Sequence, residues 1–320
     1  MARGVRHEQP SLLPGGDEAL LDLRRAKPGS APPTRATRER IPAPAFPDPP
    51  PLQEHGPARV IAVCNQKGGV GKTTSTINLG ASFAELGRKV LLVDLDPQGA
   101  LSVGLGVSAH DLDLTVNDVL LDRSKGLADV LLKTESPLLH LAPANIELSG
   151  AEIALVNEVG REQVLADAID DVVDDYDVVL IDCQPSLGLL TVNALTAADS
   201  VLIPLECEYF ALRGVALLVD TITKVRNRLN PDLEIEGILA TMYDGRTTHS
   251  REVLARLVEA FGDKVFQTVI ARTVRFPETT VAGAPITSYA PSSTGAEAYR
   301  QLAREVLSHW AAAAGDASGR

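Results

Sequence analysis

The sequence lacks the features of several large protein classes. Its three cysteines, Cys64, Cys183 and Cys207, are scattered without C-x-x-C spacing, which argues against a disulfide framework and against a cysteine metal site. No apolar run approaches the roughly 20 residues that a membrane-spanning helix needs. Arg3 and Pro10 interrupt the N-terminus where a secretory signal would need an apolar segment. We therefore expect a cytoplasmic protein without a membrane partner.

Positive charge is scarce as well. The chain has 30 Lys and Arg residues against 42 Asp and Glu residues, a net charge of −12. Residues 1–57 contain eight basic and seven acidic residues, so the deficit lies in residues 58–320, with 22 basic and 35 acidic residues. Net charge alone thus argues against nonspecific nucleic-acid binding, and any such site must be a local patch.

Proline is concentrated at the N-terminus. Residues 1–57 hold 12 of the 21 prolines and few large apolar residues, which predicts a disordered Pro-rich tail. Within it, residues 17–27 are interpreted either as a solvated charged segment or as a short amphipathic docking helix. We expect one domain over residues 58–312 and a flexible C-terminus over residues 313–320.

From residue 58 onward, apolar runs alternate with helix-length amphipathic segments. One such segment, residues 74–87, should end at Gly87, and another has a core-facing stripe at Leu218, Ile222, Val225 and Leu229. The alternation predicts an α/β domain with a mostly parallel sheet and helices on both faces. The runs expected to form strands are 60–64, 89–96, 138–143, 176–183, 199–206, 235–244 and 264–271.

Polar residues follow these expected strands at their carboxyl ends. Such ends gather on one edge of a parallel sheet, where ligands bind. The residues expected on that edge are Gln66 to Thr74, Asp94, Asp96, Gln98, Asp182, Gln184, Asp244, Arg246, Arg272 and Arg275.

The stretch NQKGGVGKTTS, residues 65–75, resembles a phosphate-binding loop with one departure. The pattern G-x-x-x-x-G-K-[ST] requires a glycine where this chain has Gln66, and a second lysine, Lys67, follows. The glycines direct backbone N–H groups at phosphate oxygens, Lys72 should reach the β and γ phosphates, and Thr73 should ligate Mg²⁺. Asp182 ends an apolar strand, as does the acidic residue of the magnesium shell in P-loop NTPases.

Together with VLLVDLDPQG and VVLIDCQPSLGLLTVNAL, this loop resembles the deviant-Walker ATPases of the ParA/Soj partition family, a branch of the MinD/ParA superfamily, over about residues 58–310. The resemblance implies that Lys67 crosses a nucleotide-sandwich dimer to the partner's phosphates and that Asp96 positions the attacking water. The alternatives are a solvated loop lysine and a helix N-cap. Catalysis is assigned to Lys67, Lys72 and Asp96, Mg²⁺ binding to Thr73 and Asp182, and ATP binding to Lys67, Gly68, Gly69, Val70, Gly71, Lys72, Thr73 and Thr74.

The resemblance further implies a homodimer in the ATP state, slow intrinsic ATP hydrolysis, a ParB-like partner that stimulates it, and association with the nucleoid. Arg246 and Arg275 fall where related proteins carry arginines implicated in sequence-independent DNA binding, and Arg272 is grouped with them. The alternative is that these arginines contact the nucleotide or the other subunit. The cargo, whether a chromosome origin, a plasmid or another assembly, stays open.

Two segments depart from the family pattern. Gln184 stands where the family usually has proline, and FPETT follows Arg275 in place of a Ser-Glu-Ala-Pro run. A MinD-type protein would need a membrane-targeting C-terminal helix, and HWAAAAGDASGR is poor in basic residues. The function that we keep as the alternative is a MinD-like or condensin-loader-associated nucleotide switch that positions a protein assembly.

Overall fold

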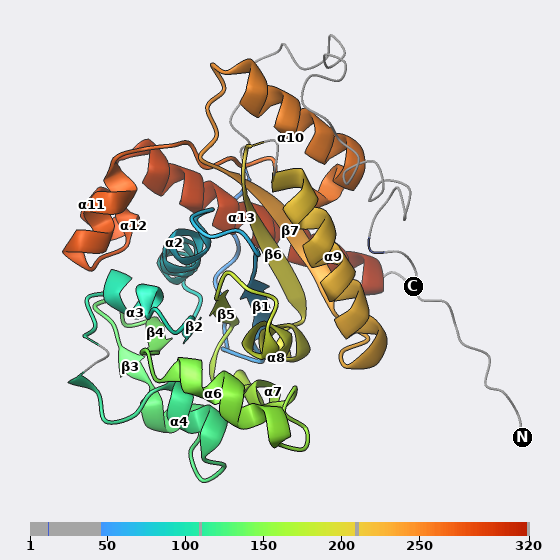
Figure 1. Ribbon diagram of the computed structural model, residues 1–320. Helices are drawn as coiled ribbons and strands as arrows, with labels where there is room; N and C mark the ends of the chain where they lie inside the picture. The colour runs from blue at the N-terminus through green and yellow to red at the C-terminus, as the bar shows by residue number, and fades with distance from the viewer. Residues whose placement is uncertain (1–11, 13–45, 109–110, 209–210, 319–320) are drawn as a thin grey trace, which may run out of the picture.

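A computed structural model of the chain describes residue 12 and residues 46–108, 111–208 and 211–318 (Figure 1). Within these residues, seven strands form one sheet in the order β3-β4-β2-β5-β1-β6-β7. All neighbours are parallel except β3 and β4, which are antiparallel. The strands are β1 (Arg59–Val63), β2 (Val90–Leu95), β3 (Leu132–Lys133), β4 (Leu139–Ala142), β5 (Val178–Cys183), β6 (Ser200–Glu206) and β7 (Glu234–Thr241).

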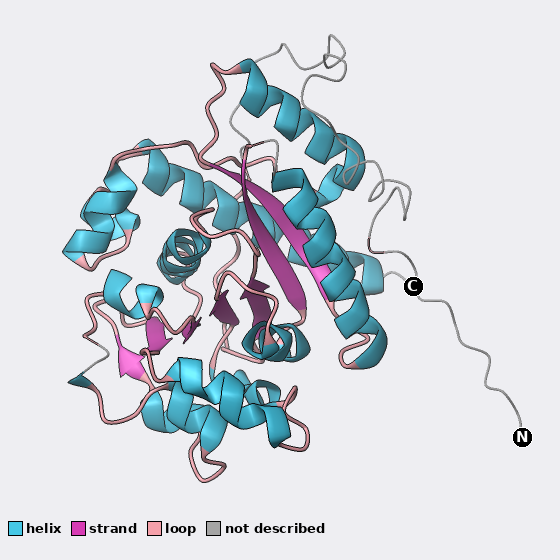
Figure 2. Ribbon diagram, viewed as in Figure 1, coloured by secondary structure: helices cyan, strands magenta, loops and turns pink. Residues whose placement is uncertain are grey.

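Helices cover both faces of this sheet, as the sequence predicted (Figures 1 and 2). In β1, Val60 and Ala62 join one core and Ile61 and Val63 join the other, because successive side chains point to opposite faces. Helices α2, α12 and α13 cover the second of these faces, and α4, α6, α7, α8 and α9 cover the first. Both faces are buried, so the central strands are apolar throughout.

The helices of the described residues are α2 (Lys72–Glu85), α3 (Ala100–Gly104), α4 (Val116–Leu121), α5 (Leu127–Val130), α6 (Leu148–Ala154), α7 (Val164–Asp170), α8 (Leu189–Ala197), α9 (Ala211–Arg228), α10 (Thr248–Phe261), α11 (Arg275–Ala282), α12 (Ile286–Tyr289) and α13 (Thr294–Ser318). Gly87 lies just beyond α2 with φ +76°, which agrees with the expected helix end. The predicted stripe of α9 is buried except for Leu229, which is partly buried past the helix end.

The prediction of a strand over residues 264–271 is wrong. This segment makes only isolated bridges beside β7. The backbone N–H groups of Gln267 and Thr268 donate instead to the buried carboxylate of Glu305 on α13, at 2.7 and 3.0 Å. Strand β3, by contrast, was not anticipated, because a two-residue strand has too short a pattern to identify.

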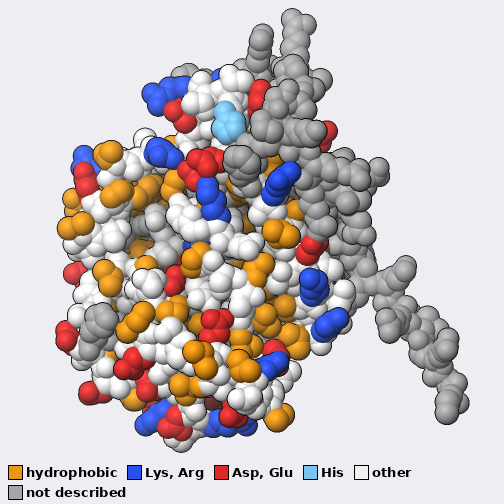
Figure 3. All heavy atoms as spheres, in the orientation of Figure 1, with side chains coloured by type: hydrophobic (Ala, Val, Ile, Leu, Met, Phe, Trp, Pro, Cys, Tyr) orange, Lys and Arg blue, Asp and Glu red, His pale blue; other side chains and the backbone are white. Residues whose placement is uncertain are grey.

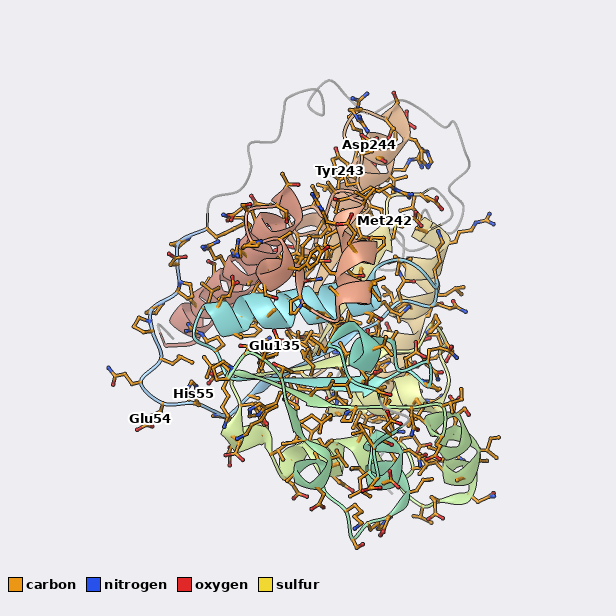
Figure 4. The ribbon with its side chains drawn as sticks, turned by 90° about the vertical axis from the view of Figure 1, so that its left-hand side faces the viewer. Glu54, His55, Glu135, Met242, Tyr243 and Asp244 are labelled. Carbon is orange, nitrogen blue, oxygen red and sulfur yellow. The ribbon has the colours of Figure 1, made fainter. Side chains whose placement is uncertain are left out.

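The end of the predicted tail lies against the domain. Asp48 pairs with Arg304 of α13 at 2.6 Å, and the carbonyl oxygen of Pro50 accepts a hydrogen bond from Arg88 at 2.9 Å. His55 lies 2.7 Å from Asp177, far from the end of β7 (Figure 4). These contacts anchor residues just before the expected domain boundary.

At the other end, α13 continues to Ser318, past the expected domain end at residue 312. The segment 17–27, for which a helix was one interpretation, lies outside the described residues.

Candidate nucleotide site

The loop between β1 and α2 has the shape that an anion site requires. Gly69 and Gly71 have φ values of +75° and +87°, a left-handed conformation that favours glycine. No atom lies within 4 Å of the place where a Cβ of Gly69 would stand, so this part of the loop is open. Helix α2 begins at Lys72, directly after the loop, and its N-terminus adds partial positive charge. The hydroxyl of Thr241, at the end of β7, donates to the carbonyl oxygen of Val70 at 2.8 Å and holds the loop in place.

Lys72, Thr73 and Asp182 meet below this loop. Lys72 is 6% exposed, and its Nζ donates to the carbonyl oxygen of Lys67 at 3.2 Å. The Thr73 hydroxyl donates to Asp182 Oδ2 at 2.7 Å, and the Thr76 hydroxyl donates to Oδ1 at 3.2 Å. The hydroxyl and carboxylate are hard oxygen donors of the kind that Mg²⁺ takes. The residues therefore fit a magnesium ion bound together with a phosphate.

Burial perturbs the carboxylate of this cluster. It raises the pKa of Asp182 to about 7, while the Thr73 hydrogen bond and the charge of Lys72 act in the opposite direction. A carboxyl group that is fully buried is costly to ionise unless a cation compensates it. A divalent cation would supply that compensation and favour the ionised ligand.

A second buried carboxylate, Asp94, lies next to Asp182 in the register of β2 and β5. Its Oδ2 accepts hydrogen bonds from the backbone and hydroxyl of Ser102 at 2.9 and 2.8 Å. Burial, followed by the charge of Asp182, raises the pKa of Asp94 to about 8. Sequence analysis placed Asp94 on this edge but gave it no role. The signal that could have found it is a pair of aspartates two residues apart at the end of a buried strand.

Asp96 follows β2 and is partly exposed. Its carboxylate accepts a hydrogen bond from the backbone of Gln98 at 3.0 Å, but the N-cap of α3 is Gly99. The interpretation of Asp96 as a helix N-cap is therefore wrong. The carboxylate lies at the same strand ends as Asp182, whose pKa its charge helps to raise.

Lys67 makes contacts that differ from those of Lys72. Its Nζ donates to Glu206 Oε2 at 2.9 Å and to Glu208 Oε2 at 2.8 Å, and its side chain is 39% exposed. Burial disfavours the charged form, but the hydrogen bonds to Glu208 and Glu206 outweigh it and raise the pKa of Lys67. The sequence pattern indicates neither glutamate. Lys67 is thus held by carboxylates at and just after the end of β6.

A cavity of about 490 Å³ borders the loop on the side of α11. Gly71 and Thr74 form its boundary with the loop, while Phe276 and Tyr299 give it aromatic walls and Arg272 adds a cation. Apolar and aromatic walls with a few polar groups are typical of small-molecule sites. The cavity is placed to take the base of a nucleotide whose phosphates lie on the loop.

The three arginines predicted to bind DNA each have an acidic partner. Arg246 makes two bonds of 2.9 Å to Asp244, just after Met242 and Tyr243 at the end of β7 (Figure 4). Arg275 pairs with Glu278 at 2.8 Å, and Arg272 pairs with Glu206 at 3.0 Å. On the face of the molecule drawn in Figure 3, Lys and Arg side chains lie among Asp and Glu side chains and do not form one continuous basic surface. Arg272 lines the cavity beside the loop.

The cysteines are buried, and two of them touch. Cys64 and Cys183 lie at the ends of β1 and β5 with their Sγ atoms 2.8 Å apart. Burial raises the pKa of the Cys183 thiol well above its usual value, which disfavours the reactive thiolate at this position. Over the described part of the chain, no helix has the length and apolarity to cross a membrane.

The chain is similar to proteins of one family. A family described as an AAA domain matches residues 58–235. The sporulation initiation inhibitor protein Soj of Bacillus subtilis is 49% identical over 251 residues, which cover 78% of this chain and 99% of Soj. The chromosome partitioning protein ParA of Caulobacter vibrioides is 48% identical over 254 residues, which cover 79% of this chain and 95% of that protein.

The chain is also similar to solved structures of nucleotide-binding proteins. Cobyrinic acid a,c-diamide synthase from Mycobacterium smegmatis, crystallised with an ATP analogue and magnesium, is 45% identical with a TM-score of 0.72 and covers 79% of this chain and 95% of its own. The cell division ATPase MinD of Pyrococcus furiosus is 29% identical with a TM-score of 0.63 and covers 78% of this chain and 99% of its own.

Proposed function

The chain belongs to the ParA/Soj family of P-loop ATPases within the MinD/ParA superfamily, and from this premise we propose that it is a DNA-binding ATPase that dimerises with ATP. It acts in chromosome or plasmid partitioning in the cytoplasm, at the nucleoid. A ParB-like partner resets it by stimulating a slow hydrolysis. One observation carries the proposal: the two lysines of one loop are held apart, Lys72 buried at the start of α2 and Lys67 partly exposed on Glu206.

The nucleotide site takes ATP with Mg²⁺. Bound ATP supplies the phosphoryl group that is transferred to water, and the metal offsets its charge. The loop glycines present backbone N–H groups and Lys72 adds a charge at the helix start. Thr73 and Asp182, whose hydroxyl and carboxylate oxygens lie 2.7 Å apart, would hold the metal, Asp182 directly or through water.

Asp96 and Lys67 have separate tasks in this proposal. Asp96 is a partly exposed carboxylate at the same edge and orients the attacking water. Lys67 reaches the phosphates of the partner subunit, where it offsets the charge on the transferred group as an arginine finger does. A lysine from each side also counters the repulsion between two acidic subunits.

Two arginines of this edge, Arg246 and Arg275, bind DNA. Arg246 and Arg275 have side chains 91% and 55% exposed, so a phosphate can reach them. A dimer presents four such cations, and contacts of this kind are blind to sequence and dependent on salt. Arg272 belongs with the nucleotide instead, since it lines the cavity beside the loop.

Three variants test this division of tasks. Lys72→Ala should lose tight ATP binding. Lys67→Ala should bind ATP as a monomer, but it should neither dimerise nor hydrolyse ATP. Asp96→Ala should dimerise and retain DNA while turnover is lost. Light scattering after size exclusion, with and without ATP, separates the three, and a Lys67→Ala protein that dimerises normally would contradict the proposed role.

The alternative is a nucleotide switch that positions a protein assembly, of the MinD-like or condensin-loader-associated kind. One observation favours it: each arginine proposed for DNA already has a carboxylate partner in its own subunit. DNA retention measured with and without ATP distinguishes the two. No ATP-dependent retention would support the switch.

A further inference from the structure

Two glutamates at the end of β6 hold the lysine that is proposed to act on the other subunit. Lys67 Nζ lies 2.9 Å from Glu206 and 2.8 Å from Glu208. A triphosphate on a facing subunit has the same sign of charge as these two carboxylates, so the three groups repel one another when they share one ammonium group. Lys67 must therefore leave these partners before it can cross.

We propose that Glu206 and Glu208 restrain Lys67 within its own subunit and thereby set the ATP concentration at which the protein dimerises. This inference rests on the proposed function, because it assumes that Lys67 acts in trans. The glutamates are positioning residues, because they contact Lys67 and act through it.

Glu206 also connects Lys67 to the nucleotide cavity. Its Oε1 accepts a bond from Arg272 at 3.0 Å while its Oε2 accepts the bond from Lys67. Arg272 lines the 490 Å³ cavity next to Gly71 and Thr74. A base in that cavity contacts Arg272 and so competes with its bond to Glu206. Nucleotide occupancy thus alters the carboxylate that holds Lys67.

The exposure of the three side chains sets the size of the effect. Glu206 is 12% exposed, but Lys67 is 39% and Glu208 is 50% exposed. Solvent screens pairs of this kind, so each makes a small contribution. The restraint therefore shifts a threshold and does not block dimerisation. Most of the shift in the ATP concentration needed for dimerisation should come from Glu206, because its carboxylate is less exposed to solvent than that of Glu208.

The test is an ATP titration of the full chain, without DNA, followed by light scattering. The Glu206→Gln and Glu208→Gln double variant should reach half dimerisation at an ATP concentration about three- to tenfold lower than the wild type, as expected from the loss of two weak pairs. Salt screens the repulsion between the acidic subunits in both proteins, but it weakens the glutamate pairs of Lys67 only in the wild type, so raising the salt should lower the wild-type midpoint by more than that of the double variant. Glu206→Asp, which keeps the charge, should stay near the wild type.

A matched control removes the same charge without touching Lys67. The Asp244→Asn and Glu278→Gln double variant loses two carboxylates whose partners are Arg246 and Arg275. Its midpoint should equal that of the wild type. If it shifts as far as the double variant at Glu206 and Glu208, general acidity is the cause and the inference is wrong.

Thermal unfolding and ATP affinity of the monomer are measured on each variant. The melting temperature should be unchanged, and the ATP affinity of the monomer should change by no more than about twofold, since the pairs are partly exposed. A wild-type chain that stays monomeric at every ATP concentration would overturn the proposed function and this inference with it. A wild type that dimerises, with an unshifted midpoint in the glutamate variants, would overturn this inference alone.

Discussion

Replacing Arg275 by alanine tests whether the nucleotide edge also holds DNA. Arg275 opens α11, and its side chain is 55% exposed and paired with Glu278. If it binds phosphate, its removal should weaken binding to every sequence alike. ATP affinity should be nearly unchanged, because the side chain pairs with Glu278 and not with the loop.

The size of the change follows from the number of contacts. A dimer contains two copies of Arg275, so the variant loses two phosphate contacts. The slope of log affinity against log salt should become shallower by about 1.8, at about 0.9 per contact. Between about 50 and 200 mM salt, the affinity gap between wild type and variant should therefore narrow about tenfold.

The assay is filter retention of two unrelated duplexes with ATP over that salt range, with a nucleotide titration in parallel. Glu278→Gln serves as the opposite perturbation. It frees Arg275 from its carboxylate partner and should strengthen DNA binding. Arg272→Ala should instead weaken ATP binding, since Arg272 lines the cavity.

Two results would refute the reasoning. An unchanged salt slope with wild-type retention would show that Arg275 does not contact phosphate. A loss of ATP affinity equal to the loss of DNA binding would assign the arginine to the nucleotide or to the partner subunit.

Three further predictions concern stability. Deleting residues 1–57 should lower the melting temperature by more than deleting residues 1–45, because only the longer deletion removes the contacts to α13 and Asp177; equal melting by both would contradict this. Gly237→Ala should cost about 2 kcal/mol, since its Cβ would meet a ring of Phe266 at 2.5 Å, while Gly214→Ala in α9, with open space, should not destabilise. Without nucleotide, the free energy of unfolding should decrease as the pH rises from about 4 to about 8. In this range folded Asp94, with its pKa raised to about 8, keeps a proton that the unfolded chain releases. Denaturant titrations over this pH range should show a smaller decrease for Asp94→Asn than for the wild type.

The sequence predicted the sheet and the phosphate loop because both depend on local pattern. A buried parallel strand reads as an apolar run, and the glycines of the loop mark backbone that needs a left-handed conformation, as at Gly69 and Gly71. Parallel strands then bring Asp96 and Asp182 to the edge that also carries the loop. These residues could be grouped without knowing the order of the strands.

The partners of Lys67 could not be predicted in this way. Glu206 is 139 residues away in the chain and meets Lys67 only because β6 lies next to β1. Adjacency of that kind is a property of the strand order, which apolar runs do not specify. The same limit explains the wrong strand prediction for residues 264–271. Two backbone N–H groups of this segment donate to the carboxylate of Glu305 on α13, whereas in a strand they would donate to a neighbouring strand.

The acidity of the chain and its proposed affinity for DNA are compatible for a physical reason. Residues 58–320 carry 22 basic against 35 acidic residues, so a single subunit repels DNA at long range, and salt screens that repulsion beyond about 10 Å. Both arginines proposed to bind DNA are also already paired, Arg246 with Asp244 and Arg275 with Glu278. A phosphate must displace a carboxylate at each contact, so one subunit gains little from two arginines. A dimer doubles the contacts on one duplex without a second loss of translational freedom. Arginines that each bind phosphate weakly, on an acidic subunit, are therefore suited to a protein that holds DNA in one nucleotide state and releases it in the other.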